Sequence, residues 1–466
     1  MPVLPDKLVR ELTGIMGRER VFTAREDRLC YSYDGTFRQY LPDVVVKPGR
    51  TEEVARVLAL ANREGIPVHP RGAGTGLSGG SVPYGGGIAL VLTDMNAIYE
   101  LNREDMLARM GPGLVTAELH RAVEKEGLFY PPDPGSAESC TMGGNVAECA
   151  GGPRALKYGV TRDYILGLEV VLADGRVIHT GGRTVKNVTA YDLTRLFTGS
   201  EGTLGVITAI TVRLIPRPRA VCTMLATFRD LETTGAAINA IMGAGVVPRT
   251  LEIMDQLAIK VVEKFSPCGL PQDAAAVLLI ETDGDLEAAQ REAGVVEAVL
   301  KKAGAAGIKM AANPAEAAEL WRARKAVSPA VGRIKPTKIS EDATVPRSKV
   351  PAMITRLGQI REQYHLDLVI FGHAGDGNLH PNILCNRKDA DEMQRVEKAI
   401  AAIFQAALEL GGTLSGEHGI GLLKAPFLRA ELGDDGLAVV ESIKRTLDPG
   451  NILNPGKVFP SAAGGK

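Results

Sequence analysis

The segment DVVVKPGRTEEVARVLALANREGIPVHPRGAGTG, residues 43–76, predicts the fold of the first part of the chain. The run VVV predicts a strand, and the amphipathic pattern after it predicts a helix with Thr51 as its N-cap and Gly65 as its stop. The run IPVHP predicts a second strand, which leads directly into a glycine-rich loop. Strand, helix, strand and glycine loop together are typical of an α+β unit that binds a nucleotide.

The glycine-rich loop extends over PRGAGTGLSGGSVPYGGG, residues 70–87. It has no Lys-Ser or Lys-Thr after its glycines, so it is not a Walker loop, and no helix pattern follows, so a Rossmann fingerprint fits poorly. Its glycines allow successive backbone N–H groups to approach an anion such as pyrophosphate. The alternative is a flexible surface loop. Further glycine clusters within residues 131–167 and 186–208 favour an extended ligand that lies against the backbone.

A second informative stretch is FGHAGDGNLHPNIL, residues 371–384, which holds two of the seven histidines of the chain. Glycine is unfavourable inside helices, and an odd spacing on one strand would turn the two rings to opposite faces. A hairpin, with LVIF as one strand and NLHPNIL as its return, brings His373 and His380 to one side. The alternative is a glycine-rich hairpin with two incidental histidines.

Composition limits the classes of protein to consider. A length of 466 residues is enough for about three domains of ~150 residues each, and the hydrophobic share of 45% is that of a globular protein. The net charge of -1 without a basic stripe makes nucleic acid an improbable partner. No apolar run reaches the ~18 residues of a membrane span, and the N-terminus lacks the apolar core of a signal peptide. We therefore expect a cytoplasmic protein without a transmembrane segment.

The six cysteines are scattered and form no C-x-x-C pair. Such scatter fits reduced thiols and argues against an iron–sulfur ligand run in this chain.

Turn and proline signals divide the chain. Pro216 and Pro218 end a strand-rich segment that includes a hairpin around Asp174-Gly175, and they predict a linker. Strands mixed with amphipathic helices follow, and the turn-rich tail LDPGNILNPGK is compact enough to dock back onto the protein. We expect three parts: a first domain at 1–218, a second domain at 219–425, and a C-terminal segment at 426–466 that docks back on the first domain.

Taken together, the motifs resemble a known family. PRGAGTGLSGG, PDPGS…TMGGNVAECAGG and FTGSEGTLGVIT are similar to the FAD-binding domain of the vanillyl-alcohol-oxidase / p-cresol-methylhydroxylase superfamily. HAGDGNLHPNIL and SGEHGIG resemble the C-terminal domain of its FAD-linked 2-hydroxy-acid dehydrogenase branch, which includes D-lactate dehydrogenases, the glycolate oxidase large subunit and D-2-hydroxyglutarate dehydrogenase. The resemblance covers about residues 38–460. It implies an α+β fold, with a two-part FAD-binding domain of the p-cresol-methylhydroxylase type and an α+β substrate (cap) domain with an antiparallel sheet.

The resemblance implies a set of FAD-binding residues in three stretches. They are Arg71, Gly72, Gly74, Thr75, Gly76, Ser78 and Gly79; Pro134, Gly135, Ser139, Gly143, Gly144 and Asn145; and Glu201, Gly202 and Ile207. Superfamily members with covalent flavin often carry a histidine where this chain has Thr75, so the resemblance implies dissociable, non-covalent FAD.

The resemblance also assigns His373, His380 and Glu417 as ligands of one divalent metal, a donor set that suits zinc, iron and manganese alike. His418 is then the general base, and Asn382 touches the substrate. Arg324 matches the arginine that binds the substrate carboxylate.

For some of these residues other readings stay open. Arg324 could be a charge on a helix surface, and Glu417 and His418 could belong to an exposed glycine loop. The role of Lys338 also stays open.

The implied reaction oxidises a D-2-hydroxy acid, with D-lactate first, then glycolate or D-2-hydroxyglutarate, to the 2-oxo acid. The substrate chelates the metal, His418 takes the hydroxyl proton, and the C2 hydride passes to flavin N5. The alternatives are a metal hydrolase that uses the two histidines and the glutamate, and a non-catalytic flavoprotein subunit.

The reduced flavin needs an electron acceptor. The segment KISEDATVPRS, residues 338–348, resembles the branch served by electron-transferring flavoprotein, so we expect that partner first and an iron–sulfur partner subunit second.

Overall fold

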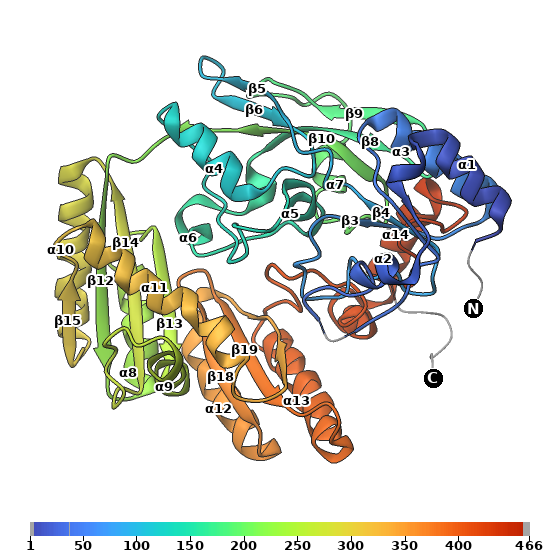
Figure 1. Cartoon of the computed structure of the whole chain (residues 1–466). Helices are drawn as coiled ribbons and strands as arrows, with labels where there is room; N and C mark the ends of the chain where they lie inside the picture. Colours follow the sequence, from blue (N-terminus) through green and yellow to red (C-terminus); the bar gives the residue numbers. More distant parts are fainter. Residues whose placement is uncertain (1–3, 37, 460–466) are drawn as a thin grey trace. The chain divides into compact units, whose positions relative to one another are not determined.

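The computed structural model describes residues 4–36 and 38–459, and the chain forms two compact units (Figure 1). The first unit consists of residues 1–150, 160–217 and 417–466, and the second of residues 151–159 and 218–416. The chain therefore passes between the units four times.

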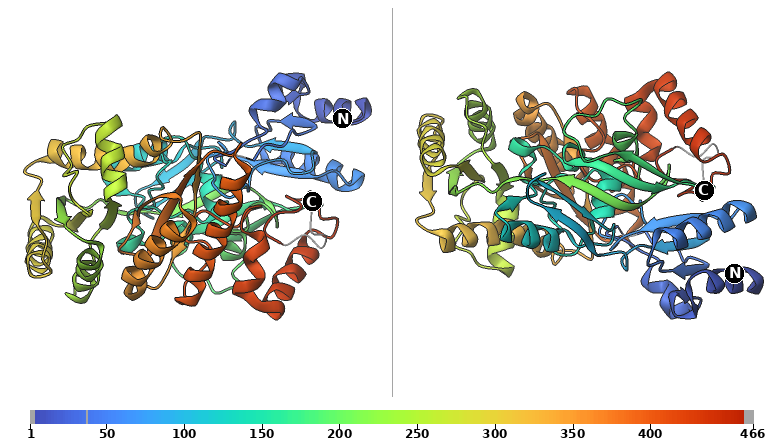
Figure 2. Two further views of the ribbon diagram at one scale, coloured as in Figure 1. Left: turned by 90° about the horizontal axis from the view of Figure 1, so that it is seen from below. Right: turned by 90° about the horizontal axis from the view of Figure 1, so that it is seen from above.

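The first unit contains a small mixed sheet in which β2 and β3 both run parallel to β4. Its strands, in spatial order, are β1 (Val21–Phe22), β2 (Val44–Val46), β4 (Ile88–Val91) and β3 (Val68–Arg71). Helices α1 (Asp6–Met16) and α3 (Thr51–Glu64) pack on it through a shared apolar core, and both views of Figure 2 show these N-terminal helices, in blue, beside the sheet.

The predicted succession of strand, helix, strand and glycine loop corresponds to β2, α3, β3 and the loop after Arg71. Gly65 ends α3 with a φ of 66°, as expected of a glycine stop. The predicted N-cap is wrong by one residue. Arg50 occupies the cap position without a side-chain cap, because the Thr51 hydroxyl donates to Glu169 Oε1 at 2.5 Å instead.

The second sheet of the first unit is antiparallel throughout. Its strands, in spatial order, are β5 (Ile98–Asn102), β6 (Leu107–Met110), β10 (Val206–Arg213), β8 (Ile165–Val171) and β9 (Val177–Gly181). The hairpin predicted around Asp174-Gly175 is the connection between β8 and β9. The accompanying helices are α4 (Thr116–Lys125), α5 (Met142–Glu148) and α7 (Leu193–Phe197).

The second unit is built on one large antiparallel sheet. Its strands, in spatial order, are β15 (Gly307–Met310), β12 (Ala220–Phe228), β14 (Ala276–Gly284), β13 (Thr250–Asp255), β18 (Asp367–His373), β19 (Asn378–Cys385) and β16 (Thr337–Ser340), and β17 (Ala343–Thr344) also pairs with β19. Two groups of helices pack with it. One group contains α8 (Leu231–Gly243), α10 (Leu286–Lys302), α12 (Val350–Tyr364) and α13 (Ala390–Glu409), and the other contains α9 (Gln256–Phe265) and α11 (Pro314–Val331).

After the second unit, the chain returns to the first unit at Glu417, and α14 (Leu428–Leu447) is the main helix of residues 417–459. The backbone N–H of Val68 donates to Ile452 O at 2.7 Å, and that of Asn454 donates to Val68 O at 2.8 Å. The division expected from the sequence placed residues 417–425 in the second domain. They belong to the first unit because the Ser78 carbonyl accepts the N–H groups of Leu422 and Leu423.

The α+β class expected from the sequence agrees with the structure, which has two sheets with helices in the first unit and an antiparallel sheet in the second. Within residues 4–36 and 38–459, no helix combines the length and apolar character needed to cross a bilayer.

Candidate functional site

A cavity in the first unit lies where the three glycine clusters meet. Several of the residues predicted to bind FAD line it, namely Arg71, Gly72, Gly143, Gly144, Glu201, Gly202 and Ile207. Thr141 and Glu148 also line the cavity, although the resemblance assigned neither of them a role. The cavity wall therefore draws on all three predicted stretches.

The cavity wall suits a ligand that lies against the backbone. A Cβ atom on Gly72 would lie 2.2 Å from Thr141 Oγ1, and one on Gly143 would lie 2.5 Å from Pro112 Cβ, so only glycine fits at either position. Thr141 Oγ1 is buried and has no hydrogen-bond partner among the described residues, which leaves it able to bind a ligand oxygen. These features fit an extended phosphate-containing cofactor such as FAD.

The remaining predicted FAD residues do not line the cavity: Gly74, Thr75, Gly76, Ser78, Gly79, Pro134, Gly135, Ser139 and Asn145. Several shape its neighbourhood instead. Gly74 has a φ of +73° and lies against the Arg71 guanidinium, which donates to Tyr33 O at 2.6 Å. The side-chain amide of Asn145 donates to Thr116 Oγ1 at 2.7 Å and so connects α5 to the start of α4.

The C-terminal tail connects two of the predicted FAD stretches. Asn454 Nδ2 donates to Gly80 O at 2.9 Å and to Glu201 O at 2.7 Å, and Lys457 Nζ donates to Gly80 O at 2.8 Å. Lys457 is 1% exposed, and burial lowers its pKa to about 7. Burial, followed by the charge of Lys457, lowers the pKa of His69 to about 3.

Glu201 binds backbone with both of its carboxylate oxygens. The N–H groups of Ile420 and Gly421 donate to Glu201 Oε1 and Oε2, each at 2.7 Å. Glu201 therefore fixes the loop that directly follows His418.

The second unit brings the two histidines of the predicted hairpin together. His373 ends β18 and His380 lies on β19, and their ring centroids are 4.9 Å apart. Each histidine is 6% exposed. The hairpin expected from the sequence therefore has the predicted form, with both imidazoles on one side.

Each histidine has a buried carboxylate at its Nδ1 atom. Glu252 Oε1 lies 2.6 Å from His373 Nδ1, and Asp342 Oδ1 lies 3.3 Å from His380 Nδ1. The hydrogen bond between Glu252 and His373 Nδ1 fixes the tautomer of His373 in which Nε2 can be a ligand, an arrangement typical of metal-binding histidines. Sequence reasoning missed both carboxylates, although Glu252 stands out as a charge within the buried strand TLEIMD.

Arg324 is held beside the histidines rather than on an exposed helix surface. Its Nη2 atom lies 2.6 Å from Glu252 Oε2, its guanidinium lies 5.0 Å from the centroid of the Phe371 ring, and its side chain is 11% exposed. Burial would raise the pKa of Glu252, but His373 and then Arg324 outweigh burial and hold that pKa below its usual value. Glu252 is therefore ionised and orients both side chains.

Asn382 and Lys338 lie on paired strands of the same sheet. Asn382 is fully buried, its Nδ2 donates to His380 O at 2.9 Å, and its Oδ1 has no hydrogen-bond partner among the described residues. Lys338 Nζ donates to Ser328 Oγ at 2.6 Å, and burial lowers the pKa of Lys338.

Glu417 and His418 are the first residues of the segment that returns to the first unit. The two residues before them are fixed in the second unit, where Asp342 Oδ2 accepts Ser415 Oγ at 2.9 Å and Gly416 N at 3.2 Å. Asp342 therefore contacts both His380 and the backbone that leads into Glu417.

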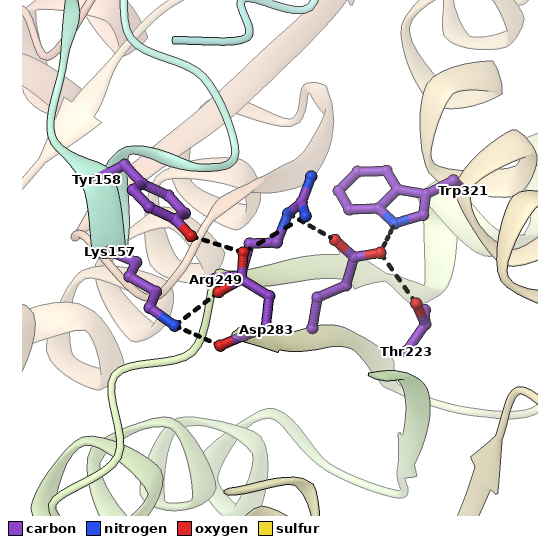
Figure 3. A network of polar contacts seen from close by, with 7 residues as sticks. Lys157, Tyr158, Thr223, Arg249, Asp283 and Trp321 are labelled. Carbon is purple, nitrogen blue, oxygen red and sulfur yellow. Dashed lines mark hydrogen bonds and ion pairs between the residues drawn. The ribbon is translucent and has the colours of Figure 1, made fainter. Parts of the chain in front are cut away.

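The short segment 151–159 belongs to the second unit and is anchored there by the polar network in Figure 3. Lys157 Nζ and Tyr158 Oη donate to the two carboxylate oxygens of Asp283, at 2.6 and 2.7 Å. Arg249 connects Asp283 to Glu281, which accepts the indole N–H of Trp321 at 2.6 Å.

Known protein families match the two parts of the chain separately. Residues 42–181 match the family described as FAD binding domain, and residues 217–458 match the family described as FAD linked oxidases, C-terminal domain. The chain is 46% identical to the glycolate oxidase subunit GlcD of Bacillus subtilis, with 97% of each chain covered. It is 38% identical to the D-lactate dehydrogenase of Anaerostipes hadrus, with 94% of each covered.

Solved structures show the same fold at low sequence identity. The structure of p-cresol methylhydroxylase with substrate bound superposes with a TM-score of 0.80 at 18% identity and covers 98% of this chain and 97% of that one. A 4-ethylphenol oxidase from Gulosibacter chungangensis gives a TM-score of 0.78 at 20% identity.

Proposed function

Since the chain belongs to the FAD-linked oxidases, an enzyme family with relatives that act on 2-hydroxy acids, we propose that it oxidises a short 2-hydroxy acid to the 2-oxo acid. Glycolate comes before D-lactate as the proposed substrate. The identity with glycolate oxidase subunits, 46% and 40%, exceeds the 38% with D-lactate dehydrogenase. This order reverses the one expected from the sequence.

The observation that carries the proposal is the pair of buried histidines with a carboxylate at each Nδ1 atom. We assign His373, His380 and Glu417 as ligands of one divalent metal. Asp342 supports the assignment of Glu417, because it holds Gly416 N while it contacts His380, and consecutive Cα atoms are only about 3.8 Å apart. When bound, the metal supplies a Lewis acid that lowers the pKa of the substrate hydroxyl.

The remaining residues bind the substrate and move its proton. Arg324 uses part of its guanidinium on Glu252 and keeps other N–H groups for a substrate carboxylate. Asn382 Oδ1 is a buried acceptor, so Asn382 is suited to contact the substrate. His418 takes the hydroxyl proton as general base.

The cofactor site is proposed in the cavity of the first unit, with non-covalent FAD against Gly72, Thr141 and Gly143. When bound, FAD supplies the acceptor for the hydride from the substrate. Matches to both FAD-linked families over most of the chain argue against the alternative of a metal hydrolase.

The electrons must leave through a partner. The relatives from Bacillus subtilis and Escherichia coli are described as subunits, which supports a partner subunit that carries its own redox centre. Electron-transferring flavoprotein stays a prediction from the sequence, to be tested by mixing it with substrate-reduced protein and following flavin reoxidation.

The central experiment is an anaerobic titration of the yellow holoprotein with D- and L-2-hydroxy acids, followed by steady-state assays with a dye acceptor. We expect glycolate or D-lactate to bleach the flavin. A flavin-loaded, metal-loaded protein that no 2-hydroxy acid bleaches would overturn the proposed function and leave the non-catalytic subunit as the better account.

A further inference from the structure

The carboxyl groups of Glu148 and Glu201 occupy one space in the first unit, with a glycine on each side. A Cβ atom on Gly419 would lie 2.0 Å from Glu148 Oε2 and 3.1 Å from Glu201 Cδ. A Cβ atom on Gly80 would lie 2.8 Å from Glu148 Oε1 and 3.5 Å from Glu201 Oε2. Both glutamates line the cavity. Side chains at either glycine position would displace one of the two carboxyl groups.

The two glutamates differ in their hydrogen bonds. Glu201 accepts two backbone N–H groups, those of Ile420 and Gly421, as a carboxylate does. Glu148 Oε2 is buried and has no hydrogen-bond partner among the described residues. An ionised carboxylate without a donor is costly when buried, and two ionised carboxylates in one space repel each other. One proton on Glu148 removes both costs.

Other charges face the pair from several elements. Lys424 and Lys457 favour ionisation of both glutamates, while Asp34 opposes it at Glu148. Burial, followed by the charge of Glu201, raises the pKa of Glu148 well above its usual value. Burial also raises the pKa of Glu201, but its two backbone donors act in the opposite direction. The balance agrees with the hydrogen bonds, which put the proton on Glu148.

We propose that Glu148 and Glu201 form an acid pair that holds one proton. Glu148 is the carboxylic acid and Glu201 is the carboxylate. The pair positions the loop that carries His418. The carboxylate fixes the amides of Ile420 and Gly421, and the neutral acid fills the space that Gly419 leaves open. Ser78 O holds the far end of the loop by accepting Leu422 N at 2.9 Å. Both glutamates are positioning residues, and their effect on turnover rests on the proposed function of His418.

The first test compares two isosteric substitutions in the flavin-loaded protein. Glutamine is a neutral isostere of a carboxylic acid, so Glu148→Gln lowers kcat less than Glu201→Gln does. Glu201→Gln offers one acceptor oxygen for two N–H groups and turns an NH2 group toward one of them. A displaced loop then lowers kcat about 100-fold with little change in KM and with flavin still bound. The opposite ranking, or equal effects, would overturn the assignment of the proton.

The second test does not depend on catalysis or on the folding of Glu201→Gln. At pH 7 the infrared spectrum of the wild type contains the C=O band of a protonated carboxyl group, and this band disappears in Glu148→Gln. A matched control is Glu138→Gln, which removes a carboxyl group with an exposed side chain fraction of 85% and leaves the band unchanged. If Glu148→Gln retains every such band, Glu148 is ionised and the acid pair is refuted. A protein that oxidises no 2-hydroxy acid but loses the band would refute the proposed function alone.

Discussion

Glu252 in the second unit is buried and Glu148 in the first has a buried carboxyl oxygen, but their surroundings shift their pKa values in opposite directions. Glu252 meets His373 and Arg324, each at 2.6 Å, and its pKa is lowered. Glu148 meets a second carboxyl group, and its pKa is raised. Burial acts in the same direction on both groups. The partners therefore decide which glutamate is ionised, and the two units use the same residue for opposite purposes.

The largest expected effect comes from removing one of the two buried histidines of the hairpin in the second unit. His380→Ala takes away one of three proposed metal ligands, so we expect metal content to fall and turnover to drop by about 1000-fold, or about 4 kcal/mol, with flavin retained. Metal analysis and steady-state assays check this. The matched control is His179→Ala, at a histidine with a 73% exposed side chain, which should change neither quantity. Unchanged metal content in His380→Ala would remove the proposed metal site.

The next effect concerns Glu252 itself. Glu252→Ala leaves Arg324 and His373 without their shared partner in a buried environment, which costs about 3–5 kcal/mol of unfolding free energy. Denaturant unfolding of the metal-free protein measures the loss. Glu138→Gln should be neutral in the same assay, because its side chain is 85% exposed. A loss below about 1 kcal/mol would mean that the ion pairs do not hold the site together.

Packing around the acid pair in the first unit can be tested with two glycines. Gly419 has a φ of +81°, and an added Cβ would lie 2.0 Å from Glu148 Oε2, whereas Gly433 has a φ of +67° and nothing within 4 Å. Alanine costs about 1–2 kcal/mol at Gly433 from backbone strain alone. At Gly419 we expect about 1–3 kcal/mol more from overpacking. Equal thermal shifts for the two alanine variants would show that the space around Glu148 is not tightly filled.

A smaller effect concerns the pH dependence of stability. Asp255 lies in the second unit, but its pKa is raised, as that of Glu148 is in the first unit. Asp255 is the N-cap of α9 and meets no ionic partner within salt-bridge distance among the described residues, and burial raises its pKa to about 6. Its folded pKa lies above its unfolded value, so its contribution to stability is complete below pH ~4 and is lost as the pH rises through ~6. We expect a loss of about 2–3 kcal/mol over that interval. Asp255→Asn should flatten this part of the stability profile, and an unchanged profile would contradict the shifted pKa.

Local patterns predicted much of the fold. The hairpin around His373 and His380 and the succession of β2, α3 and β3 follow from periodicity and turn residues within a few positions of one another. The N-cap of α3 was missed because the Thr51 hydroxyl binds Glu169, a residue 118 positions away.

The candidate site was predicted less completely for the same reason. Glu252 and His373 are 121 positions apart, and no pattern in the sequence around either residue predicts that they are in contact. Glu148 lies in the motif TMGGNVAECAGG, whose glycines predicted a cofactor site, but no pattern in that motif predicted a role for the Glu148 carboxyl group. Segment 151–159 gave no sign that it would join the second unit, since its anchor Asp283 lies more than 120 positions away.

The bond between Lys457 and Gly80 joins residues 377 positions apart. At the pace of ribosomal synthesis, about 5–20 residues per second, that distance corresponds to roughly 20–75 s of translation. Throughout this interval the glycine loop has already been synthesised. Lys457, which donates a hydrogen bond to the carbonyl of Gly80 in that loop, has not. The unit whose N-terminal strands are synthesised first is therefore the last to close. Chaperones that shelter nascent chains, and the supply of cofactor at the moment of release, should matter more for this half of the enzyme than for the other.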